Sequence, residues 1–374
     1  MRVLVVSAPL LGHLLPMLPL TRALHAAGHE VRVAAGGDAL SADTAGLGVI
    51  DVAPGFRFGR VATRTVLAHP RAARAELAGE SGTRTIGLLF GAINEELADT
   101  LVTVVERWRP DRVIYEPLAV AGALAAARHR VPAVLLENSL LDGPELVRAT
   151  LRTRLFRRAL RRHGFDEELP DPATAITIAP PSLVGDRAGR PMRAVPEDGT
   201  GTGPGRPAEP GTPPRIVVSR STVDLPGPGD PMPAVLAAAS GVDAEIVLVG
   251  PAPRIGRRSL PDNVRTVEQV PLTAVLAGAA ALVHRGGAGT VLGALGAGIP
   301  QLAVPGPGER RHNAELVAHR GAGLAVPARE ITADVLNRLV ADPGYAAAAR
   351  EVRDEMAAMP DPAELVGPIT ATPG

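Results

Sequence analysis

Two stretches in which short apolar strands alternate with helices are separated by a segment dense in glycine and proline. This segment, PEDGTGTGPGRPAEPGTPP at residues 196–214, has almost no apolar content and is typical of a linker. Strands that alternate with helices indicate a parallel sheet with helices on its faces. The chain is therefore expected to fold as two Rossmann-like, doubly wound α/β domains.

The first stretch opens with a strand, a loop and a helix. Arg2–Ala8 is a β-branched run typical of a buried parallel strand, Pro9–His13 forms the loop, and Leu14–Ala27 has helical periodicity that ends at Gly28. No pattern is readable over Phe56–Phe90, which we expect to be rich in loops. Later strands are expected at Glu30–Ala35, Arg112–Tyr115 and Ala133–Glu137, and helices at Asn94–Trp108 and Val120–Arg128.

The same alternation restarts after the linker. Strands are expected at Arg215–Ser219, Ala244–Gly250, Ala280–His284 and Gln301–Val304, and helices at Thr290–Gly298 and Asn313–Arg320. Two such domains would place the ends of their strands across a cleft. Ligands of doubly wound sheets bind at the carboxyl ends of strands and at helix N-termini.

Composition narrows the function classes. The chain has 374 residues, of which 46% are apolar, enough for two domains with full-sized cores. The formal net charge of +0 gives no reason to expect a nucleic-acid or anionic-membrane partner. The absence of cysteine excludes disulfides and thiolate nucleophiles. His13 and two prolines interrupt the N-terminal apolar run, so we expect a cytoplasmic protein without a signal peptide or membrane insertion.

The strongest local signal is the sequence HRGGAGT at residues 284–290, which follows an apolar strand and precedes a helix. Glycines at 286, 287 and 289 let backbone amides approach a ligand closely at a helix N-terminus, which suits an anion such as a diphosphate. His284, at the end of the strand, is expected to donate a hydrogen bond to a phosphate oxygen. A simple tight turn is the alternative interpretation of the glycines.

The wider segment resembles a known family. LVHRGGAGTVLGALGAGIPQLAVPGPGERRHNAELVAHRGAGL, at residues 282–324, is similar to the donor-binding signature of nucleotide-sugar-dependent glycosyltransferases. The actinobacterial enzymes that decorate macrolides, anthracyclines and enediynes are the most similar. Further resemblance is spread over nearly the whole chain, in PLLGHLLPMLPLTRALHAAGHEV at the start, VIYEPLAVAG at 113–122, IAPPSL at 178–183, MRAVPEDG at 192–199 and AAMPDPAELV at 357–366.

The resemblance implies a GT-B fold with an N-terminal acceptor domain at residues 1–196, a linker at 197–213 and a C-terminal donor domain at 214–355. The tail, 356–374, is expected to cross back to the first domain. The implied activity is an inverting, metal-independent transfer of a hexose-type sugar from a nucleoside diphosphate to a hydroxyl of a hydrophobic natural-product aglycone. No cofactor is implied. The donor-binding residues implied by the resemblance are Thr222, Val270, His284, Gly286, Gly287, Ala288, Gly289, Thr290, Glu309, Arg310 and Asn313.

The catalytic residues come from the first domain. In such enzymes the histidine of the first loop is the general base, and the matching residue here is His13; histidine suits the task because its unperturbed pKa lies near neutrality. A base histidine is usually oriented by a carboxylate, and Glu116 follows the strand Arg112–Tyr115 at the same edge of the sheet. A solvated histidine and a surface glutamate are the alternative interpretations.

The sequence also departs from the family. Glu309 and Arg310 stand where the family has Asp-Gln, and Ser221 stands where it has the glycine before Thr222. Because the Asp-Gln pair binds sugar hydroxyls, its replacement favours a deoxysugar donor. The resemblance implies that the nucleotide of this donor is thymidine diphosphate (TDP). Two other functions remain open: a non-catalytic homologue that assists a partner transferase, and a C-glycosyltransferase. A homodimer or an auxiliary protein is the expected kind of protein partner.

Overall fold

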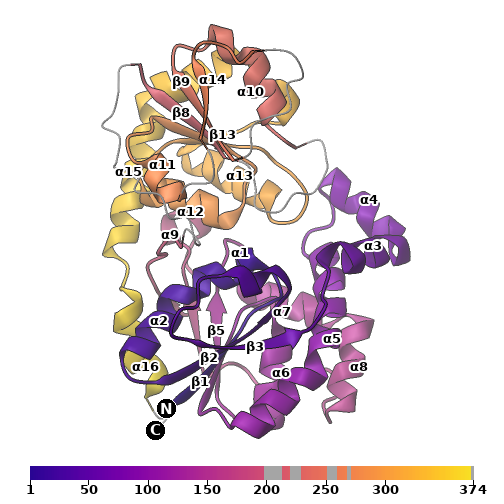
Figure 1. Ribbon diagram of the computed structural model, residues 1–374. Coiled ribbons are helices and arrows are strands. Elements are labelled where there is room, and N and C mark those ends of the chain that lie inside the picture. The colour runs from indigo at the N-terminus through magenta and orange to yellow at the C-terminus, as the bar shows by residue number, and fades with distance from the viewer. Residues whose placement is uncertain (198–212, 220–228, 251–258, 268–270, 372–374) are drawn as a thin grey trace. The chain divides into compact units, whose positions relative to one another are not determined.

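The computed structural model describes residues 1–197, 213–219, 229–250, 259–267 and 271–371 (Figure 1). The chain divides into two compact units. Unit 1 comprises Met1–Ala179, Asp186–Glu197 and Met359–Gly374, and unit 2 comprises Pro180–Gly185 and Asp198–Ala358. Most of the expected linker, from 198 to 212, lies outside the described residues.

Unit 1 is built on a sheet of parallel strands in the order β3-β2-β1-β4-β5-β6-β7. The chain starts in the middle of the sheet, winds to one edge, and then returns to build the other half from β4. This order places a topological switch point between β1 and β4. The strands are β1 Arg2–Val6, β2 Glu30–Gly36, β3 Gly48–Ala53, β4 Arg112–Tyr115, β5 Ala133–Glu137, β6 Thr174–Thr177 and β7 Arg190–Pro191.

Helices cover both faces of this sheet. Leu4 and Val6 pack on one face with side chains of α5 and α6, while Val3 and Val5 are equally buried on the other. Figure 1 shows α5, α6 and α8 grouped on one side and α2 with α16 on the other. The helices are α1 Leu11–Leu14, α2 Leu18–Ala26, α3 Phe58–Ala68, α4 Pro70–Ala78, α5 Arg84–Trp108, α6 Val120–Arg128, α7 Gly143–Leu151, α8 Arg154–Arg162 and α16 Val366–Thr370, with 3₁₀ turns at Leu15–Met17, Gly37–Ser41 and Pro362–Leu365.

Unit 2 repeats the architecture with parallel strands in the order β10-β9-β8-β11-β12-β13, so its switch point lies between β8 and β11. Ile216 and Val218 face a core shared with α10 and α14, whereas Val217 between them faces α11 and α12. The strands are β8 Arg215–Ser219, β9 Glu245–Val249, β10 Val264–Val267, β11 Ala281–His284, β12 Gln301–Ala303 and β13 Gly323–Ala325. The helices are α9 Pro181–Val184, α10 Met232–Ala238, α11 Leu272–Leu276, α12 Ala288–Gly296, α13 Arg310–Arg320, α14 Ala333–Ala341 and α15 Pro343–Ala358, with 3₁₀ turns at Ala239–Gly241 and Ala328–Glu330.

The expected fold class, two doubly wound α/β domains, is confirmed by these two sheets. One expectation was wrong: residues 56–90 are not rich in loops, because α3, α4 and the start of α5 occupy most of them. The first helix also differs from the expected single run, since Pro16 and Pro19 divide it into α1, a 3₁₀ turn and α2.

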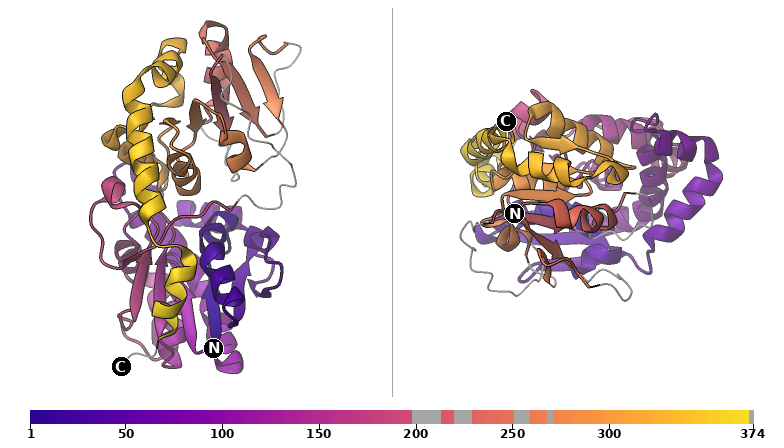
Figure 2. Two further views of the ribbon diagram at one scale, coloured as in Figure 1. Left: turned by 90° about the vertical axis from the view of Figure 1, so that its left-hand side faces the viewer. Right: turned by 90° about the horizontal axis from the view of Figure 1, so that it is seen from above.

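The last residues of the chain belong to unit 1. The 3₁₀ turn at Pro362–Leu365 packs on α2, and Arg112 donates to the backbone oxygens of Ile369 and Ala371. In Figure 2 this segment is the yellow end of the chain that follows α15. In unit 2, α15 packs against α12. No helix among the described residues is both long and apolar enough to cross a membrane.

Candidate functional site

In unit 1 the two predicted catalytic side chains lie at the carboxyl ends of β1 and β4, which are adjacent strands. His13 lies on α1, the short helix that follows β1, and Glu116 follows β4 directly. The Nδ1 atom of His13 and the Oε1 atom of Glu116 are 3.1 Å apart. The structure thus brings together the two residues that the sequence analysis singled out for catalysis, at the switch point where doubly wound sheets bind their ligands.

Glu116 is fixed in a fully buried position. Its side chain is 0% exposed, and besides His13 it accepts hydrogen bonds from the backbone amides of Ala8, at 3.1 Å, and Leu118, at 2.8 Å. A carboxylate can only accept, so the ring proton of His13 must lie on Nδ1 and the lone pair on Nε2. In the neutral ring of this tautomer, Nε2 is the atom that can accept a proton.

Further contacts hold His13 and the helix α1 that carries it. Asn138, which follows β5, donates through Nδ2 to the backbone oxygen of His13 at 2.9 Å. The ring of Phe90, on α5, lies with its centroid 5.3 Å from that of His13. Asp38 accepts from the amide of Leu11 at the start of α1. The sequence analysis missed Asn138, although a polar residue at a strand's carboxyl end is a signal that could have found it.

In unit 2 the glycine-rich segment joins β11 to α12. Gly286 has a φ of 76°, and a Cβ atom there would lie 2.8 Å from the backbone oxygen of Arg310. A side chain is therefore excluded at this position by both conformation and space. A Cβ atom on Gly287 or Gly289 would meet nothing within 4 Å. The first turn of α12 thus begins beside open space, with Ala288 and Thr290 on the same turn.

His284 differs from its expected role. It is 1% exposed, its Nε2 lies 2.7 Å from Oε1 of Gln301, and its Nδ1 accepts from the amide of Gly286 at 2.9 Å. Burial lowers the pKa of His284 to about 4, so the ring is neutral with its proton on Nε2. Because its one N–H donates to Gln301, His284 shapes the glycine loop in this structure and does not offer that donor to a phosphate.

Three other expected donor-binding residues lie at the N-terminus of α13. Glu309 accepts from the amide of Ala288 through Oε1 at 3.0 Å, and Nε of Arg310 donates to the backbone oxygen of Pro307 at 3.1 Å. Asn313 is 0% exposed and donates through Nδ2 to the backbone oxygen of Gly286 at 2.8 Å. The bonds of Glu309 and Asn313 hold the start of α13 against the glycine loop.

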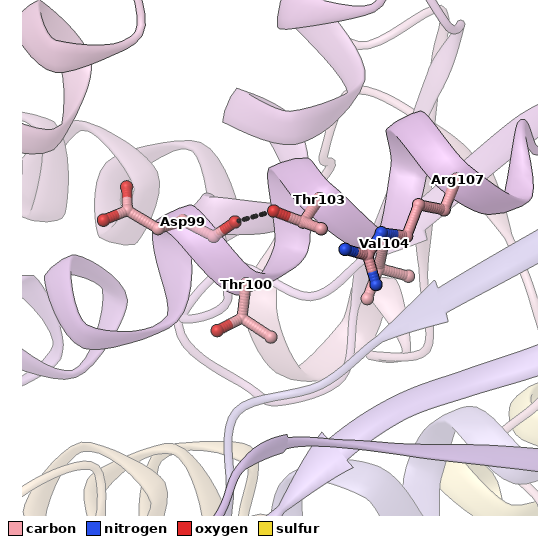
Figure 3. A pocket seen from close by; sticks show the side chains of 5 residues that line it. All are labelled: Asp99, Thr100, Thr103, Val104 and Arg107. Atoms are coloured by element: carbon pink, nitrogen blue, oxygen red, sulfur yellow. Dashed lines mark hydrogen bonds between the residues drawn. The ribbon is translucent and has the colours of Figure 1, made fainter.

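Two expected donor-binding residues, Thr222 and Val270, lie outside the described residues, as does Ser221. A separate hollow of about 360 Å³ on unit 1 is lined by Asp99, Thr100, Thr103, Val104 and Arg107 (Figure 3). All five side chains come from α5, and the one bond drawn among them runs from Thr103 to the backbone oxygen of Asp99. The hollow brings together no groups from different elements, so we assign it no chemistry.

Comparison with known proteins gives consistent matches. The family model described as "Erythromycin biosynthesis protein CIII-like, N-terminal domain" matches residues 22–219, and the corresponding C-terminal-domain model matches residues 233–372. The elloramycin glycosyltransferase ElmGT of Streptomyces olivaceus is 37% identical over 383 residues, which cover 98% of this chain and 96% of that protein.

Solved structures match over the same length. The glycosyltransferase SnogD from Streptomyces nogalater superposes with a TM-score of 0.80 and 33% identity, covering 98% of each chain. The glycosyltransferase SsfS6 from Streptomyces sp. SF2575, complexed with thymidine diphosphate, gives a TM-score of 0.81 and 27% identity over 99% of each chain.

Proposed function

The chain belongs to the erythromycin biosynthesis protein CIII-like family of natural-product glycosyltransferases. We propose that it transfers the sugar of a TDP-sugar donor to a hydroxyl of a hydrophobic aglycone, with inversion at the anomeric carbon of the sugar. Glycosyl transfer from a nucleotide sugar to an aglycone is the general activity of such enzymes. The observation that supports His13 as the general base is its contact with the buried carboxylate of Glu116.

The proposed reaction is a single displacement. Nε2 of His13 takes the proton of the acceptor hydroxyl while its oxygen bonds to the anomeric carbon, and the bond from that carbon to the phosphate oxygen breaks. The nucleoside diphosphate leaves with the electron pair. One displacement at the face opposite the leaving group inverts the configuration. Glu116 supports the step by holding the ring and by stabilising the imidazolium that forms. The Phe90 ring beside His13 suits an apolar acceptor.

The base role is tested with His13→Ala. We expect kcat to fall by about two to four orders of magnitude, because general-base catalysis by a positioned side chain contributes that much. The KM for the donor should hardly change, since the donor is proposed to bind unit 2. The measurement is initial rates with both substrates varied. A variant that turns over at near the wild-type rate would exclude His13 as the base.

A matched variant, Glu116→Gln, separates orientation from proton transfer. Glutamine keeps the size of the side chain but presents an amide N–H₂ to one of the donors that now reach the carboxylate. We expect a lower kcat with an unchanged donor KM in a variant that is fully folded. A purely structural residue would instead lower the amount of folded enzyme, which circular dichroism measures, and leave the kcat of the folded fraction unchanged. The same measurement tests the rival function, a non-catalytic partner protein. That function predicts no turnover even in the wild type.

The donor diphosphate is proposed to bind the amides of the first turn of α12. Helix N-termini carry a partial positive charge and amides without intrahelical partners, so they favour anions. The open space beside Gly287 and Gly289 supports a close approach of the phosphates. A relative crystallised with TDP supports thymidine as the nucleoside.

The sugar is proposed to be a deoxysugar. Glu309 and Arg310 replace the family's hydroxyl-binding Asp-Gln, and both side chains are bonded to backbone atoms of their own unit. A site that lacks groups aimed at a hydroxyl gains little from a hydroxylated sugar. The test is competition between a TDP-deoxysugar and uridine-diphosphate glucose for one accepted aglycone. A higher kcat/KM for the glucose donor would refute the proposal.

A further inference from the structure

The side chain of Glu309 bonds to a helix other than its own. Glu309 immediately precedes α13, in the position where acidic side chains often cap a helix, but it makes no such bond to α13. Its Oε1 atom instead accepts from the amide of Ala288, the first residue of α12, at 3.0 Å. The N-terminus of α12 already holds an anion, and that anion belongs to the protein.

Packing of the glycine loop brings Glu309 within reach of α12. Gly286 lies against the backbone of Arg310, where a Cβ atom would come within 2.8 Å of the carbonyl oxygen, and Asn313 bonds to the oxygen of Gly286. These contacts hold the start of α13 beside the start of α12. The family residue at position 309 is an aspartate, which is one methylene shorter, and the extra length of glutamate lets the carboxylate extend to the neighbouring helix.

We propose that Glu309 is an internal competitor of the donor diphosphate and thereby sets the affinity for it. The proposal rests on the donor site proposed above. The diphosphate and the carboxylate are both anions that seek the amide of Ala288, so Glu309 must leave that amide when the donor binds. Between two anions a few ångströms apart, repulsion adds to the cost of the lost hydrogen bond.

The competition has a measurable size. A hydrogen bond to a charged group contributes about 1.5–3 kcal/mol, and a neutral one about 0.5–1.5 kcal/mol. The charge of Glu309 therefore adds about 1–1.5 kcal/mol, which corresponds to about a five- to twelvefold change in affinity. Removing the charge of Glu309 should therefore strengthen nucleotide-diphosphate binding, whereas loss of a residue that binds only the sugar would leave that affinity unchanged.

The test is calorimetric titration of the full chain with inorganic pyrophosphate and with TDP. Glutamine at 309 can still accept from the amide of Ala288 through a neutral oxygen, but it carries no charge. We therefore expect Glu309→Gln to bind both about five- to twelvefold more tightly than the wild type. Glu309→Asp retains the charge but falls short of the amide, so it should bind TDP more tightly than the wild type by a smaller factor. Glu315→Gln, an exposed position on the same helix, makes the same change in net charge and should leave both affinities unchanged.

A second variant tests the donor site independently of the competition by Glu309. Gly287→Val serves as the reference variant, because its side chain would fill the space beside the α12 N-terminus. If Gly287→Val weakens TDP binding while Glu309→Gln leaves it unchanged or weaker, the donor site stands and the competition is refuted. If TDP binds and neither variant changes its affinity, the donor site is refuted and the inference with it. Circular dichroism establishes that each variant is folded.

Discussion

Two histidines near the switch points of the two sheets have opposite environments. His13 is partly exposed and paired with a carboxylate, whereas His284 is buried and paired with the neutral amide of Gln301. Motif position predicted that both residues matter. It could not predict their hydrogen-bond partners, because these lie 103 and 17 residues away along the chain and only the fold brings them close. The acidic partner of His13 was expected, but Gln301 was not.

The buried His284 gives a prediction about acid stability. Its pKa is about 4 when folded and 6.5 in the reference state, so between these values the unfolded chain binds a proton that the folded chain does not. Stability should therefore fall as the pH drops from 6.5 towards 4, by at most about 1.4 kcal/mol per pH unit from this group. Above that window the group is neutral in both states and contributes no pH dependence.

The measurement is the thermal unfolding midpoint of the wild type and of His284→Gln at about pH 7.5 and about pH 5. Glutamine at 284 does not titrate, so the unfolding midpoint of the variant should fall less on acidification than that of the wild type. At the higher pH its midpoint should be lower than that of the wild type, because the hydrogen bonds to Gly286 and Gln301 change. Equal losses in the two proteins would show that His284 is not the group responsible.

Among the elements, helix starts and glycine positions were the hardest to predict. Helix α5 begins ten residues before the expected Asn94, at Arg84. Gly87 and Gly91 lower the helix propensity of this stretch. In the structure, however, a Cβ atom on Gly87 would lie 2.8 Å from the oxygen of Ala149, and one on Gly91 would lie 2.2 Å from Oγ1 of Thr153. These glycines allow α5 to pack closely on the α7–α8 region, a tertiary reason that periodicity cannot reveal.

Two adjacent glycines at the start of α12 allow ligand binding to be tested separately from folding. Gly287 has a φ of −68° and a ψ of 139°, which a β-branched residue adopts readily, so Gly287→Val should fold normally. We expect it to bind TDP at least about tenfold more weakly, because the side chain blocks the backbone approach of the diphosphate. Calorimetry gives the affinity, and unchanged binding in the folded variant would place the donor elsewhere.

The control is the neighbouring glycine. Gly286→Ala puts a methyl group at a φ of 76° and against the oxygen of Arg310, so it should lower the thermal midpoint as well as TDP affinity. The pair distinguishes the two kinds of glycine in the motif. Gly286 is required by the fold, whereas Gly287 is required only by a ligand.

At the scale of the whole molecule, the two-domain organisation was predictable because alternation of strands and helices is a local signal that repeats on both sides of a polar linker. The exact extent of each unit could not be predicted from the sequence. The expected first domain ended at residue 196 without interruption, but Pro180–Gly185 belongs to unit 2, where α9 packs on α13. No sequence pattern marks so short an excursion, since α9 has only four residues.

The only tryptophan of the chain allows the two units to be followed separately. Trp108 belongs to unit 1, where it is 8% exposed and lies 4.9 Å from the guanidinium of Arg32. Nucleotide bound to unit 2 at a hundred times its Kd stabilises that unit by about 2.7 kcal/mol. We expect TDP to raise the calorimetric transition of unit 2 more than the midpoint seen by Trp108 fluorescence. Equal shifts would show either that TDP stabilises both units or that the two units unfold in one transition.

The return of residues 359–374 to unit 1 determines how such an enzyme can be recombined. A single exchange at the linker would combine unit 1 of one enzyme with the last helix of another, packed against an α2 and an Arg112 that did not evolve with it. An exchange of the complete unit 1 therefore takes two crossovers, one at the linker and one just after α15. If unit 1 binds the acceptor, as the resemblance implies, acceptor specificity is encoded by two separate parts of the gene.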